Sequence, residues 1–431
     1  MSEEVLINAT ASETRVAMVE KGVLQEIIIE RSNRQSLVGN IYKGKVCRVL
    51  PGMQAAFIDI GLERNAFLHF SNLVDIHQTD KKNSIDKLLR EGQTLLVQVI
   101  KEPLGTKGAR LTALIAIPSR YMIFLPGSSN MIGISHRIES IQERQRLKDI
   151  VLQYTGITDH GLTETPSASK TRLLTYCDNY AFIVRTATEG VEENLLCADI
   201  DFLCQLWKDI IEQEITAKPG SLIYTDLSLV LRTARDLIGT KIDRVRIDSP
   251  DIYREAFDFA KKFVPELVPL MELYSGEQPI FDLYSVNEEI TKALERKVSL
   301  KSGGNLVIDQ TEAMTIIDVN TGGYVGERNL EETIFHTNLE AAQAIARQLR
   351  LRNLGGIIIL DFIDMQEPEH KRQVLQTLTK CLKHDHAKTK ISKFSSLGLV
   401  QMTRQRTRDS LEQVLCKTCP TCHGQGLIKT I

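Results

Sequence analysis

The chain has 431 residues, of which 42% are hydrophobic and 25% charged, and its formal net charge is −2. This composition is typical of a globular protein of roughly three domains, and the eight cysteines are too few for a disulfide scaffold at this length. No apolar run reaches the ~18 residues that a membrane span needs, and the N-terminus has no apolar secretory core, so we expect a cytoplasmic protein.

Short strands dominate the first part of the chain. Residues 1–34 alternate between apolar and other side chains, as strands do. Residues 35–117 contain five further short strands, which turn residues such as Pro51-Gly52 and Gly61 separate. This pattern predicts a small β-barrel of the OB type.

Two phenylalanines lie near strand ends of this predicted barrel. Phe57 and Phe67 have several basic residues beside them, among which is Lys107. OB folds bind single-stranded nucleic acid by stacking bases on exposed aromatic rings within a basic groove. The alternative is that both rings fill the barrel interior, and the pattern alone leaves both interpretations open.

Residues 118–230 mix strands and helices. The segment "YAFIVRTATEG" predicts a strand that ends at Arg185 and Thr186, which by themselves look like surface residues. Residues 231–293 are expected to be largely helical after the strand "KIDRVRIDS". Two more strands follow, and then apolar residues at helical spacing predict one long helix from residue 330.

Acidic and amide side chains follow two apolar segments within residues 294–413. Asp318 and Asn320 come at the end of "MTIIDVN", and Asp361 ends the apolar run "IIILDF", which predicts a buried central strand. If the two strands are parallel neighbours, their acids meet at one sheet edge, where open α/β sheets bind ligands. Adjacent carboxylates favour Mg²⁺, which takes few protein carboxylates and completes its shell with water and phosphate oxygens. Such a metal could activate water against a phosphodiester.

The pattern alone does not decide between this metal site and a structural role. Asp318 and Asp361 could instead cap strand ends or pair with nearby arginines. Asp309 and Asp364 have similar contexts, so the sequence pattern does not select two aspartates out of four.

The region before the C-terminus is basic. Residues 371–410 contain ten Lys or Arg residues and two acids. Arg404, Arg406 and Arg408 alternate along the chain, so an extended segment would place all three on one side. That side could bind phosphates or could be an ordinary solvated face.

The last residues crowd potential zinc ligands together. Cys416, Cys419, Cys422 and His423 follow one another closely, and no second cluster of this kind occurs upstream. A structural zinc site usually takes four ligands from two separated pairs. The sequence therefore provides what looks like half of a site.

Several long motifs, in order, resemble the ribonuclease E/G family over nearly the whole chain. They are "NIYKGKVCRVLPGMQAAFIDIG", "KEPLGTKGARLT", "SGGNLVIDQTEAMTIIDVNTG", "NLEAAQAIARQLRLRNLGGIIILDFIDM" and "CPTCHGQG". Within the family, "ETRVAMVEKGVLQEIIIER" is nearer to the ribonuclease G branch. The resemblance implies a Mg²⁺-dependent endoribonuclease that acts on single-stranded RNA in rRNA maturation and mRNA decay. Such enzymes leave 5′-phosphate and 3′-hydroxyl ends and prefer a 5′-monophosphate on the substrate.

The resemblance also implies roles for single residues. Asp318 and Asp361 match the two aspartates that hold the catalytic magnesium in the family, and Asn320 matches an asparagine that supports them. Arg185 and Thr186 match the pair that grips the 5′-monophosphate, which suits a guanidinium fork plus a hydroxyl. The matched RNA-contacting positions of the OB module are Phe57, Phe67 and Lys107.

The implied architecture is a multidomain α+β and α/β protein. A non-catalytic ribonuclease H-like fold would be assembled from residues 1–34 and 231–293. An OB-fold RNA-binding module at 35–117 and a 5′-monophosphate sensor module at 118–230 would be inserted into it. A deoxyribonuclease I-like catalytic domain would occupy residues 294–413.

Residues 414–431 resemble the zinc link of the family. There, one CPxC motif from each of two chains shares a single zinc, so the resemblance implies a homodimer with Zn²⁺ held by Cys419 and Cys422 of both chains. An intrachain site that adds Cys416 and His423, or thiols without metal, are the alternatives. Family members continue into a small C-terminal domain, which we expect to be absent here because the chain ends shortly after the motif.

Two other classes of function stay open from the sequence. One is a non-catalytic RNA-binding or scaffold protein that uses the OB fold and the basic surfaces. The other is a metal-dependent deoxyribonuclease, which the OB module and the sensor pair make the weaker hypothesis.

Overall fold

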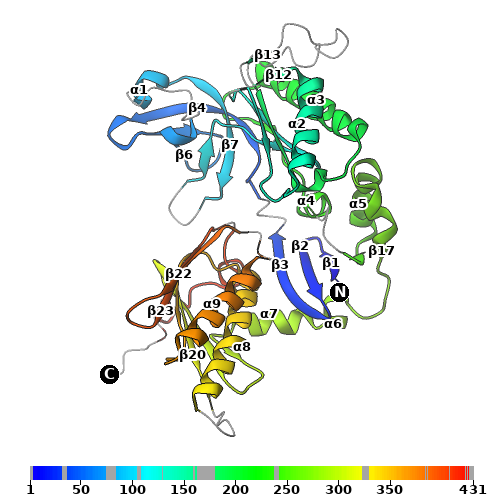
Figure 1. Ribbon diagram of the computed structural model, residues 1–431. Helices are drawn as coiled ribbons and strands as arrows, with labels where there is room; N and C mark the ends of the chain where they lie inside the picture. Colours follow the sequence, from blue (N-terminus) through cyan, green and yellow to red (C-terminus); the bar gives the residue numbers. More distant parts are fainter. Residues whose placement is uncertain are drawn as a thin grey trace. The chain divides into compact units, whose positions relative to one another are not determined.

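The chain folds into two compact units, each with its own sheets and apolar core (Figure 1). Unit 1 comprises residues 1–31, 241–253 and 270–431, and unit 2 comprises residues 32–240 and 254–269. None of the described helices is long and apolar enough to cross a membrane. The structure is a computed structural model that describes residues 3–31, 36–73, 84–103, 108–128, 130–158, 161–162, 180–236, 242–322, 330–383, 385, 387–406, 408–422, 424 and 426.

The first sheet of unit 1 joins strands from distant parts of the sequence in the order β17–β16–β1–β2–β3. β1 is antiparallel to β2 and parallel to β16, with Val5 opposite Val245. Lys21 and Gly22 both adopt positive φ between β2 and β3, as two-residue hairpin turns require. The strands are β1 (Glu3–Ala9), β2 (Glu13–Glu20), β3 (Val23–Arg31), β16 (Arg244–Ile247) and β17 (Met271–Leu273).

Two short helices, α6 (Ile280–Leu283) and α7 (Val286–Leu294), share a core with this sheet. Phe281 and Val286 are buried in the same cluster as Leu6 and Ala17 of the strands. The sequence pattern predicted mainly helix over residues 231–293, and β17 is an additional strand within that stretch.

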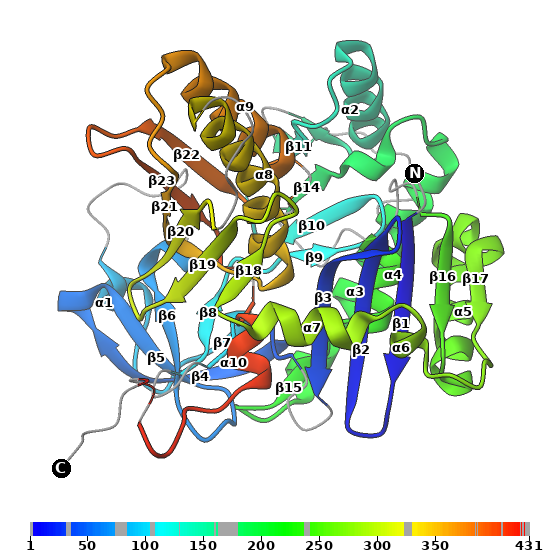
Figure 2. The same ribbon diagram turned by 90° about the horizontal axis from the view of Figure 1, so that it is seen from below.

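The second sheet of unit 1 has the order β18–β19–β20–β21–β23–β22 (Figure 2). Its strands are β18 (Lys297–Ser299), β19 (Asn305–Gln310), β20 (Met314–Asn320), β21 (Gly356–Asp361), β22 (Thr389–Phe394) and β23 (Leu399–Arg404). The helices α8 (Leu330–Leu351) and α9 (Pro368–Leu382) contribute to its core. β20 and β21 are parallel, as the α8 crossover between them requires.

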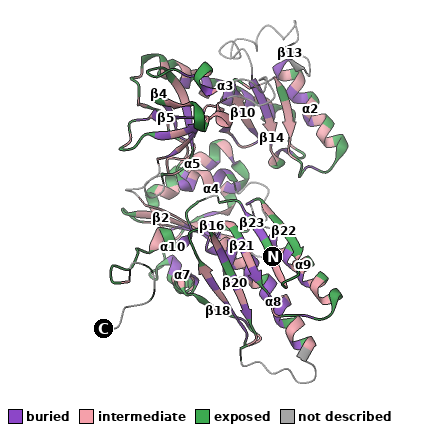
Figure 3. Cartoon of the chain, turned by 90° about the vertical axis from the view of Figure 1, so that its left-hand side faces the viewer, coloured by how far each residue is buried: buried purple, intermediate pink, exposed green. Residues whose placement is uncertain are grey.

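Only one face of this second sheet is covered by the helices. Ile317 and Leu360 are fully buried in the core that α8 and α9 share. The alternate residues Ile316 and Ile357 point to the other face and are 39% and 49% exposed. The expectation of a central strand at "IIILDF" is therefore correct in position, but the strand is buried on one face only, because α8 and α9 lie along that face and no described element of unit 1 covers the other (Figure 3).

Helix α8 contacts both sheets of unit 1. On one side it contributes to the core of the second sheet. On the other, Arg347 Nε donates to the Leu24 carbonyl of β3 at 3.0 Å, and Arg350 Nη2 donates to Gln25 Oε1 at 3.0 Å. The helix ends before Asn353, which has a positive φ of 49°. Asn tolerates this left-handed conformation better than most residues, so it terminates the helix at low cost.

The alternating arginines near the C-terminus do not share one solvent-facing side. Arg404 ends β23 and is buried, where it forms a two-bonded ion pair with Asp385 at 2.7 and 3.0 Å. Arg406 donates to the Gly355 carbonyl, and Arg408 pairs with Glu26. The expectation of a common phosphate surface is wrong for Arg404, because its side chain points into the protein and finds a buried counter-charge there.

Helix α10 (Leu411–Leu415) follows and is fixed to the rest of unit 1. Ser410 and Gln413 form a reciprocal capping box at its start. Leu411 is buried in the core of the first sheet, and its amide donates to the Arg352 carbonyl at 2.9 Å. The cysteine-rich segment therefore begins from an anchored helix.

Unit 2 contains the β-barrel predicted from residues 35–117. Its sheet has the order β15–β4–β5–β6–β8–β7, and an additional pairing of β4 with β7 closes five of these strands into a barrel. The short helix α1 (Ile85–Leu88) contributes Ile85 to the barrel core. The strands are β4 (Ile41–Leu50), β5 (Ala55–Asp59), β6 (Ala66–His69), β7 (Thr94–Lys101), β8 (Arg110–Thr112) and β15 (Leu222–Tyr224).

The second sheet of unit 2 is small and packs against two helices. Its order is β11–β14–β10–β9, and a separate hairpin pairs β12 with β13. Helix α2 begins after Ser140, whose side chain accepts a hydrogen bond from the Glu143 amide. Phe124, Phe182 and Trp207 are buried together in the core. The elements are β9 (Ile117–Pro118), β10 (Met122–Pro126), β11 (Met131–Ile134), α2 (Ile141–Thr155), β12 (Ile157–Thr158), β13 (Gly161–Leu162), β14 (Tyr180–Val184), α3 (Glu193–Thr216), α4 (Leu229–Asp236) and α5 (Pro250–Phe263).

Candidate functional site

The second sheet of unit 1 brings two aspartates together. β20 and β21 run parallel in a register that places Asp318 directly opposite Asp361. Side chains alternate along a strand, so both carboxylates lie on the face opposite the buried Ile317 and Leu360. The pair is therefore accessible from the face that α8 and α9 leave open.

The surroundings of the pair suit a divalent cation. Asn320 lies on the same face, and its Nδ2 donates to Asp318 Oδ2 at 2.7 Å. Partial burial, then the negative charges of Asp318 and Asp364, raise the pKa of Asp361 above its usual value. A bound cation would relieve this mutual repulsion, since carboxylate oxygens are the ligands that Mg²⁺ prefers.

The remaining two candidate aspartates differ from each other. Asp309 is paired with Arg296, with Nε–Oδ1 and Nη2–Oδ2 distances of 2.5 and 2.8 Å, which lowers its pKa. Asp364 lies in the loop after β21, close enough for its charge to act on Asp361. The fold therefore neutralises Asp309 and leaves Asp364 beside the pair.

Helix α8 holds the loop that follows Asp361. The fully buried Asn338 donates from Nδ2 to the Ile363 carbonyl at 2.8 Å, and its Oδ1 accepts the Ile363 amide at 3.1 Å. Glu331 Oε1 accepts the amides of Gln366 and Glu367 at 3.0 and 3.3 Å. The sequence pattern did not single out Asn338 or Glu331, because a polar residue on a helix does not reveal which loop it will meet.

The two barrel phenylalanines form a cluster on the outside of the barrel. Phe57 of β5 lies directly opposite Phe67 of β6, with ring centroids 6.1 Å apart in an edge-to-face arrangement. Their neighbours Ile58 and Leu68 point inward and are fully buried in the barrel core. The half-buried phenylalanine rings are thus outward-facing, and the interpretation that they fill the barrel interior is wrong.

Basic and aromatic residues flank this cluster. Arg48 lies opposite Phe57, and Arg110 lies opposite Phe67. His69, two residues after Phe67 on the same face, has its ring centroid 6.5 Å from that of Phe67. The period-2 alternation of β6 could have indicated His69 from the sequence. The predicted contact Lys107 lies outside the described residues.

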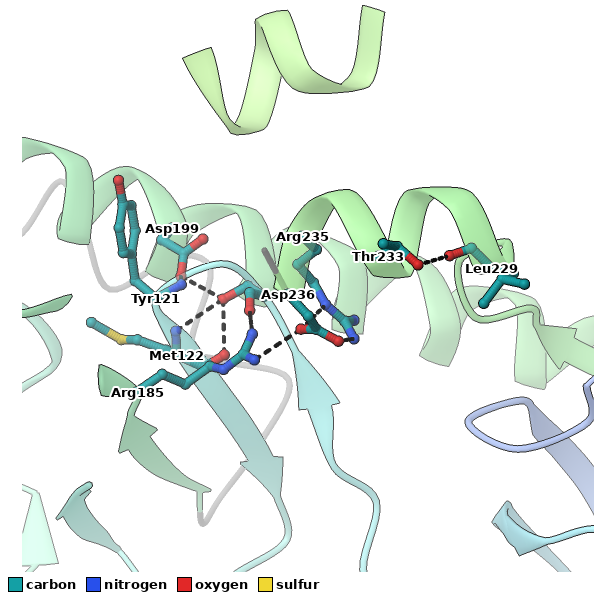
Figure 4. A network of polar contacts seen from close by, with 9 residues as sticks. Tyr121, Met122, Arg185, Asp199, Leu229, Thr233, Arg235 and Asp236 are labelled. Atoms are coloured by element: carbon teal, nitrogen blue, oxygen red, sulfur yellow. Dashed lines mark hydrogen bonds and ion pairs between the residues drawn. The ribbon is translucent and has the colours of Figure 1, made fainter. Parts of the chain in front are cut away.

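Arg185 and Thr186 follow the end of β14 and carry polar contacts of different kinds, of which Figure 4 shows those of Arg185. Arg185 Nη1 donates to the Ser119 carbonyl at 2.7 Å, and Nη2 pairs with Asp236 Oδ1 at 2.9 Å. The Thr186 hydroxyl lies 3.1 Å from the hydroxyl of Ser135. The structure thus places a guanidinium and two hydroxyls near one strand end, and the sequence pattern missed both Asp236 and Ser135.

The half-buried carboxylate of Asp199 stabilises the turn that Arg185 contacts. Asp199 of α3 accepts hydrogen bonds from the Ser119 hydroxyl and, at 3.2 Å, from the Tyr121 amide. Burial raises the pKa of Asp199 to about 6, against the opposing effect of these hydrogen bonds. The carbonyl of Ser119 that Arg185 contacts therefore belongs to a fixed turn.

The described cysteines of the C-terminal segment do not close a site within one chain. Cys416 and Cys419 are exposed, and the Gly426 amide donates to Cys422 Sγ at 3.4 Å. The hydrogen bond from the backbone of Cys422, then that from Thr421, lowers the pKa of the Cys419 thiol, which favours the thiolate that zinc requires. Among the described residues, no three His, Cys, Asp or Glu side chains gather as a metal site, and His423 lies outside them.

Two models of known protein families match consecutive parts of the chain. The model of the ribonuclease E/G family matches residues 116–407, and that of the S1 RNA-binding domain matches residues 37–113. The second range contains the closed barrel, so the prediction of an OB-type RNA-binding module is confirmed.

The individual proteins that this chain resembles are ribonucleases G and E. Ribonuclease G of Salmonella typhimurium is 52% identical over 440 residues, which span all of this chain and 85% of that protein. Ribonuclease G of Haemophilus influenzae is 52% identical over 99% of this chain and 84% of its own length. Ribonuclease E of Haemophilus influenzae is 37% identical over 99% of this chain but only 44% of its own length. The nearer resemblance to the ribonuclease G branch is confirmed.

Proposed function

The chain belongs to the ribonuclease E/G family and is an endoribonuclease with an S1 RNA-binding domain, and from this premise we propose that Asp318, Asn320 and Asp361 form its catalytic centre. The enzyme would cut single-stranded RNA, including rRNA precursors and mRNA, in a Mg²⁺-dependent reaction. The products would carry 5′-phosphate and 3′-hydroxyl ends.

The observation that carries this proposal is the register of β20 and β21, in which Asp318 and Asp361 are direct partners on an open sheet face. The two carboxylates would hold the magnesium, and the Asn320 amide would keep the Asp318 carboxylate in one orientation through its 2.7 Å hydrogen bond. Bound Mg²⁺ supplies an activated water and offsets charge on the phosphodiester. Arg185 and the barrel surface would bind the rest of the RNA.

Asp318→Asn and Asp361→Asn test the catalytic centre. Each keeps the shape of the side chain and removes a metal-binding charge, so cleavage of a single-stranded RNA in Mg²⁺ should be lost while RNA affinity changes by less than about twofold. Asp309→Asn is the matched control, because Asp309 is on the neighbouring strand but is paired with Arg296. Cleavage at the wild-type rate by either of the first two variants would contradict the assignment.

We propose that Phe57 and Phe67, with Lys107, contact RNA on the barrel. The support is the outward position of the two rings beside Arg48 and Arg110. Stacking of a base on an aromatic side chain contributes roughly 1–3 kcal/mol, so Phe67→Ala should weaken binding of single-stranded RNA about 5- to 150-fold. Phe70 is partly buried against the barrel core, so Phe70→Ala controls for loss of barrel packing. Equal effects of both variants on binding and stability would refute the stacking role.

We propose that Arg185 and Thr186 sense a 5′-monophosphate. The guanidinium fork and the paired Thr186 and Ser135 hydroxyls could donate to a terminal phosphate. Arg185→Ala should reduce the ratio of cleavage rates for 5′-monophosphate over 5′-hydroxyl RNA of one sequence, chiefly by slowing the former. An unchanged ratio would refute the sensor.

The domain boundaries and the named folds are also proposals. The shared sheet of β1–β3 with β16 and β17 supports a ribonuclease H-like fold built from residues 1–34 and 231–293. The sheet of β18–β23 with α8 and α9 supports a deoxyribonuclease I-like fold at 294–413. The sheet that carries Arg185 supports a separate sensor module at 118–230.

We propose that residues 414–431 form half of a zinc site that two chains share through Cys419 and Cys422. The support is the position of both thiols beyond the anchored α10, where Cys419 is exposed and Cys422 half-buried, together with the lowered pKa of Cys419. Native mass spectrometry should show a dimer with one zinc per two chains, which chelation dissociates. One zinc per chain in a monomer would instead support an intrachain site.

A further inference from the structure

The guanidinium of Arg185 is held on two sides by fixed groups. The Ser119 carbonyl accepts Nη1, and Ser119 is itself buried and bonded through its hydroxyl to Asp199. Asp236 Oδ1 accepts Nη2 at 2.9 Å (Figure 4). An arginine side chain loses rotamer entropy when it is fixed. Because these two hydrogen bonds already fix the Arg185 side chain, it loses less of this entropy when RNA binds.

Asp236 is in turn fixed by its neighbour in the sequence. Arg235 is buried, and its Nε and Nη2 donate to the two carboxylate oxygens of Asp236 at 3.1 and 3.2 Å. Burial acts to raise the pKa of Asp236, but the hydrogen bonds and charges of Arg235 and Arg185 outweigh it and lower the pKa, so the carboxylate is ionised at neutral pH. A carboxylate clamped by a buried arginine makes a rigid anchor.

The charges of this trio decide between two possible roles of Asp236. A carboxylate that faced Arg185 alone would cancel its charge and compete with a phosphate. Here Arg235 supplies a second positive charge to the same carboxylate, so the three side chains together keep one net positive charge. A guanidinium has five N–H donors, and the two contacts above use two of them. Arg185 thus keeps both charge and donors for a ligand.

We propose that Asp236 is a positioning residue for 5′-end recognition: fixed by Arg235, it holds the Arg185 guanidinium in the orientation that receives a terminal phosphate monoester. The proposal rests on the proposed sensor role of Arg185. In this proposal Asp236 does not itself contact the RNA. Because Asp236 and the buried Arg235 both belong to α4, this helix links the end of β14 to the buried part of unit 2.

The test compares Asp236→Ala with Asp236→Asn in the full-length enzyme. The probes are two RNA oligonucleotides of one sequence, with a 5′-monophosphate or a 5′-hydroxyl, and the readout is the ratio of their kcat/KM values. Asp236→Ala should lower the ratio roughly three- to tenfold, through the monophosphate substrate alone, because a charge-assisted hydrogen bond is lost. Asp236→Asn keeps an acceptor for Arg185 and should retain most of the ratio. Asp209→Asn, which removes an exposed carboxylate of α3 in the same unit, should change neither rate.

The sign of the change separates positioning from simple electrostatics. Asp236→Ala makes the region more positive, so a competing carboxylate would predict a higher ratio; an increased or unchanged ratio overturns the proposal. Equal losses for both substrates, with a lowered Tm, also overturn it, since they indicate a structural role only. In the Arg185→Ala background, Asp236→Ala should have no further effect on the ratio. If Arg185→Ala lowers the ratio and Asp236→Ala does not, only the positioning role fails; if Arg185→Ala has no effect, the sensor assignment itself fails.

Discussion

Asn338 connects the stability of unit 1 to the geometry of the acidic pair, and its replacement gives a quantitative test. Its side chain is 0% exposed and makes two hydrogen bonds to Ile363, at 2.8 and 3.1 Å, two residues after Asp361. Asn338→Ala removes both bonds and leaves a backbone carbonyl and amide of the loop without partners. No other described side chain is bonded to these two backbone atoms.

The expected loss of stability follows from the number of polar groups left without a partner, which are the Ile363 carbonyl and amide. Leaving a buried polar group unsatisfied costs about 1–3 kcal/mol. Because the loop is only partly buried and water can reach it in part, the lower half of that range applies, and Asn338→Ala should lower the free energy of unfolding by about 2–4 kcal/mol. The released loop begins at Asp361, and a shift of about 1 Å in a catalytic group can cost roughly 100-fold in rate. Cleavage should therefore fall by about 10- to 100-fold.

Urea unfolding measured by two signals makes the assay specific. Trp207 is the only tryptophan of the chain and lies on α3 in unit 2, so its fluorescence reports unit 2, while far-UV circular dichroism reports both units. Asn338→Ala should bring the unit 1 transition to lower urea and leave the Trp207 transition in place. Asn338→Asp, of nearly equal size, should be at least as destabilising because it turns an oxygen toward the Ile363 carbonyl. Wild-type stability and cleavage rate in Asn338→Ala would refute the reasoning.

Two further predictions concern the carboxylates of Asp385, which is buried, and Asp199, which is half-buried. Asp385→Asn should lower the free energy of unfolding by about 3–5 kcal/mol, because Arg404, 5% exposed, would lose the counter-charge of a carboxylate that is 2% exposed; a urea midpoint equal to that of the wild type would contradict this. Burial raises the pKa of Asp199 from 3.8 to about 6, so the folded chain holds this proton more tightly than the unfolded chain, and stability falls as the pH rises from about 4 to 6. Asp199→Asn removes this decline, so its Tm relative to the wild type should increase across that window and level off above it, whereas a pH-independent difference would argue against the shifted pKa.

Much of the local structure could be predicted from the sequence because it depends on short-range periodicity. Turn residues and the alternation of side chains along extended backbone predicted the strands of the barrel, although they left open whether Phe57 and Phe67 face its interior or its surface. The same rule placed Asp318 and Asn320 on one side of β20, where they form a hydrogen bond. The long helix was predicted from apolar residues at helical spacing, and it runs from Leu330 to Leu351.

Periodicity failed where the partner of a side chain decided its role. Arg404, Arg406 and Arg408 alternate as a solvated stripe would, yet Arg404 turns inward because Asp385 offers a buried counter-charge. Likewise the run "IIIL" before Asp361 is apolar throughout, but Ile357 is half exposed because helices cover only one face of the sheet. Neither outcome is encoded in the segment itself.

The sequence by itself determined the elements, the barrel, the family and the strand ends that carry the acids, since these depend on local backbone preference and on motifs. Only the tertiary structure decided which acids lie side by side: the register of β20 against β21 pairs Asp318 with Asp361, while Arg296 neutralises Asp309. It also brought Asp236 to Arg185 across 51 residues. Pairings of this kind depend on how whole elements dock, which no short stretch of the chain specifies.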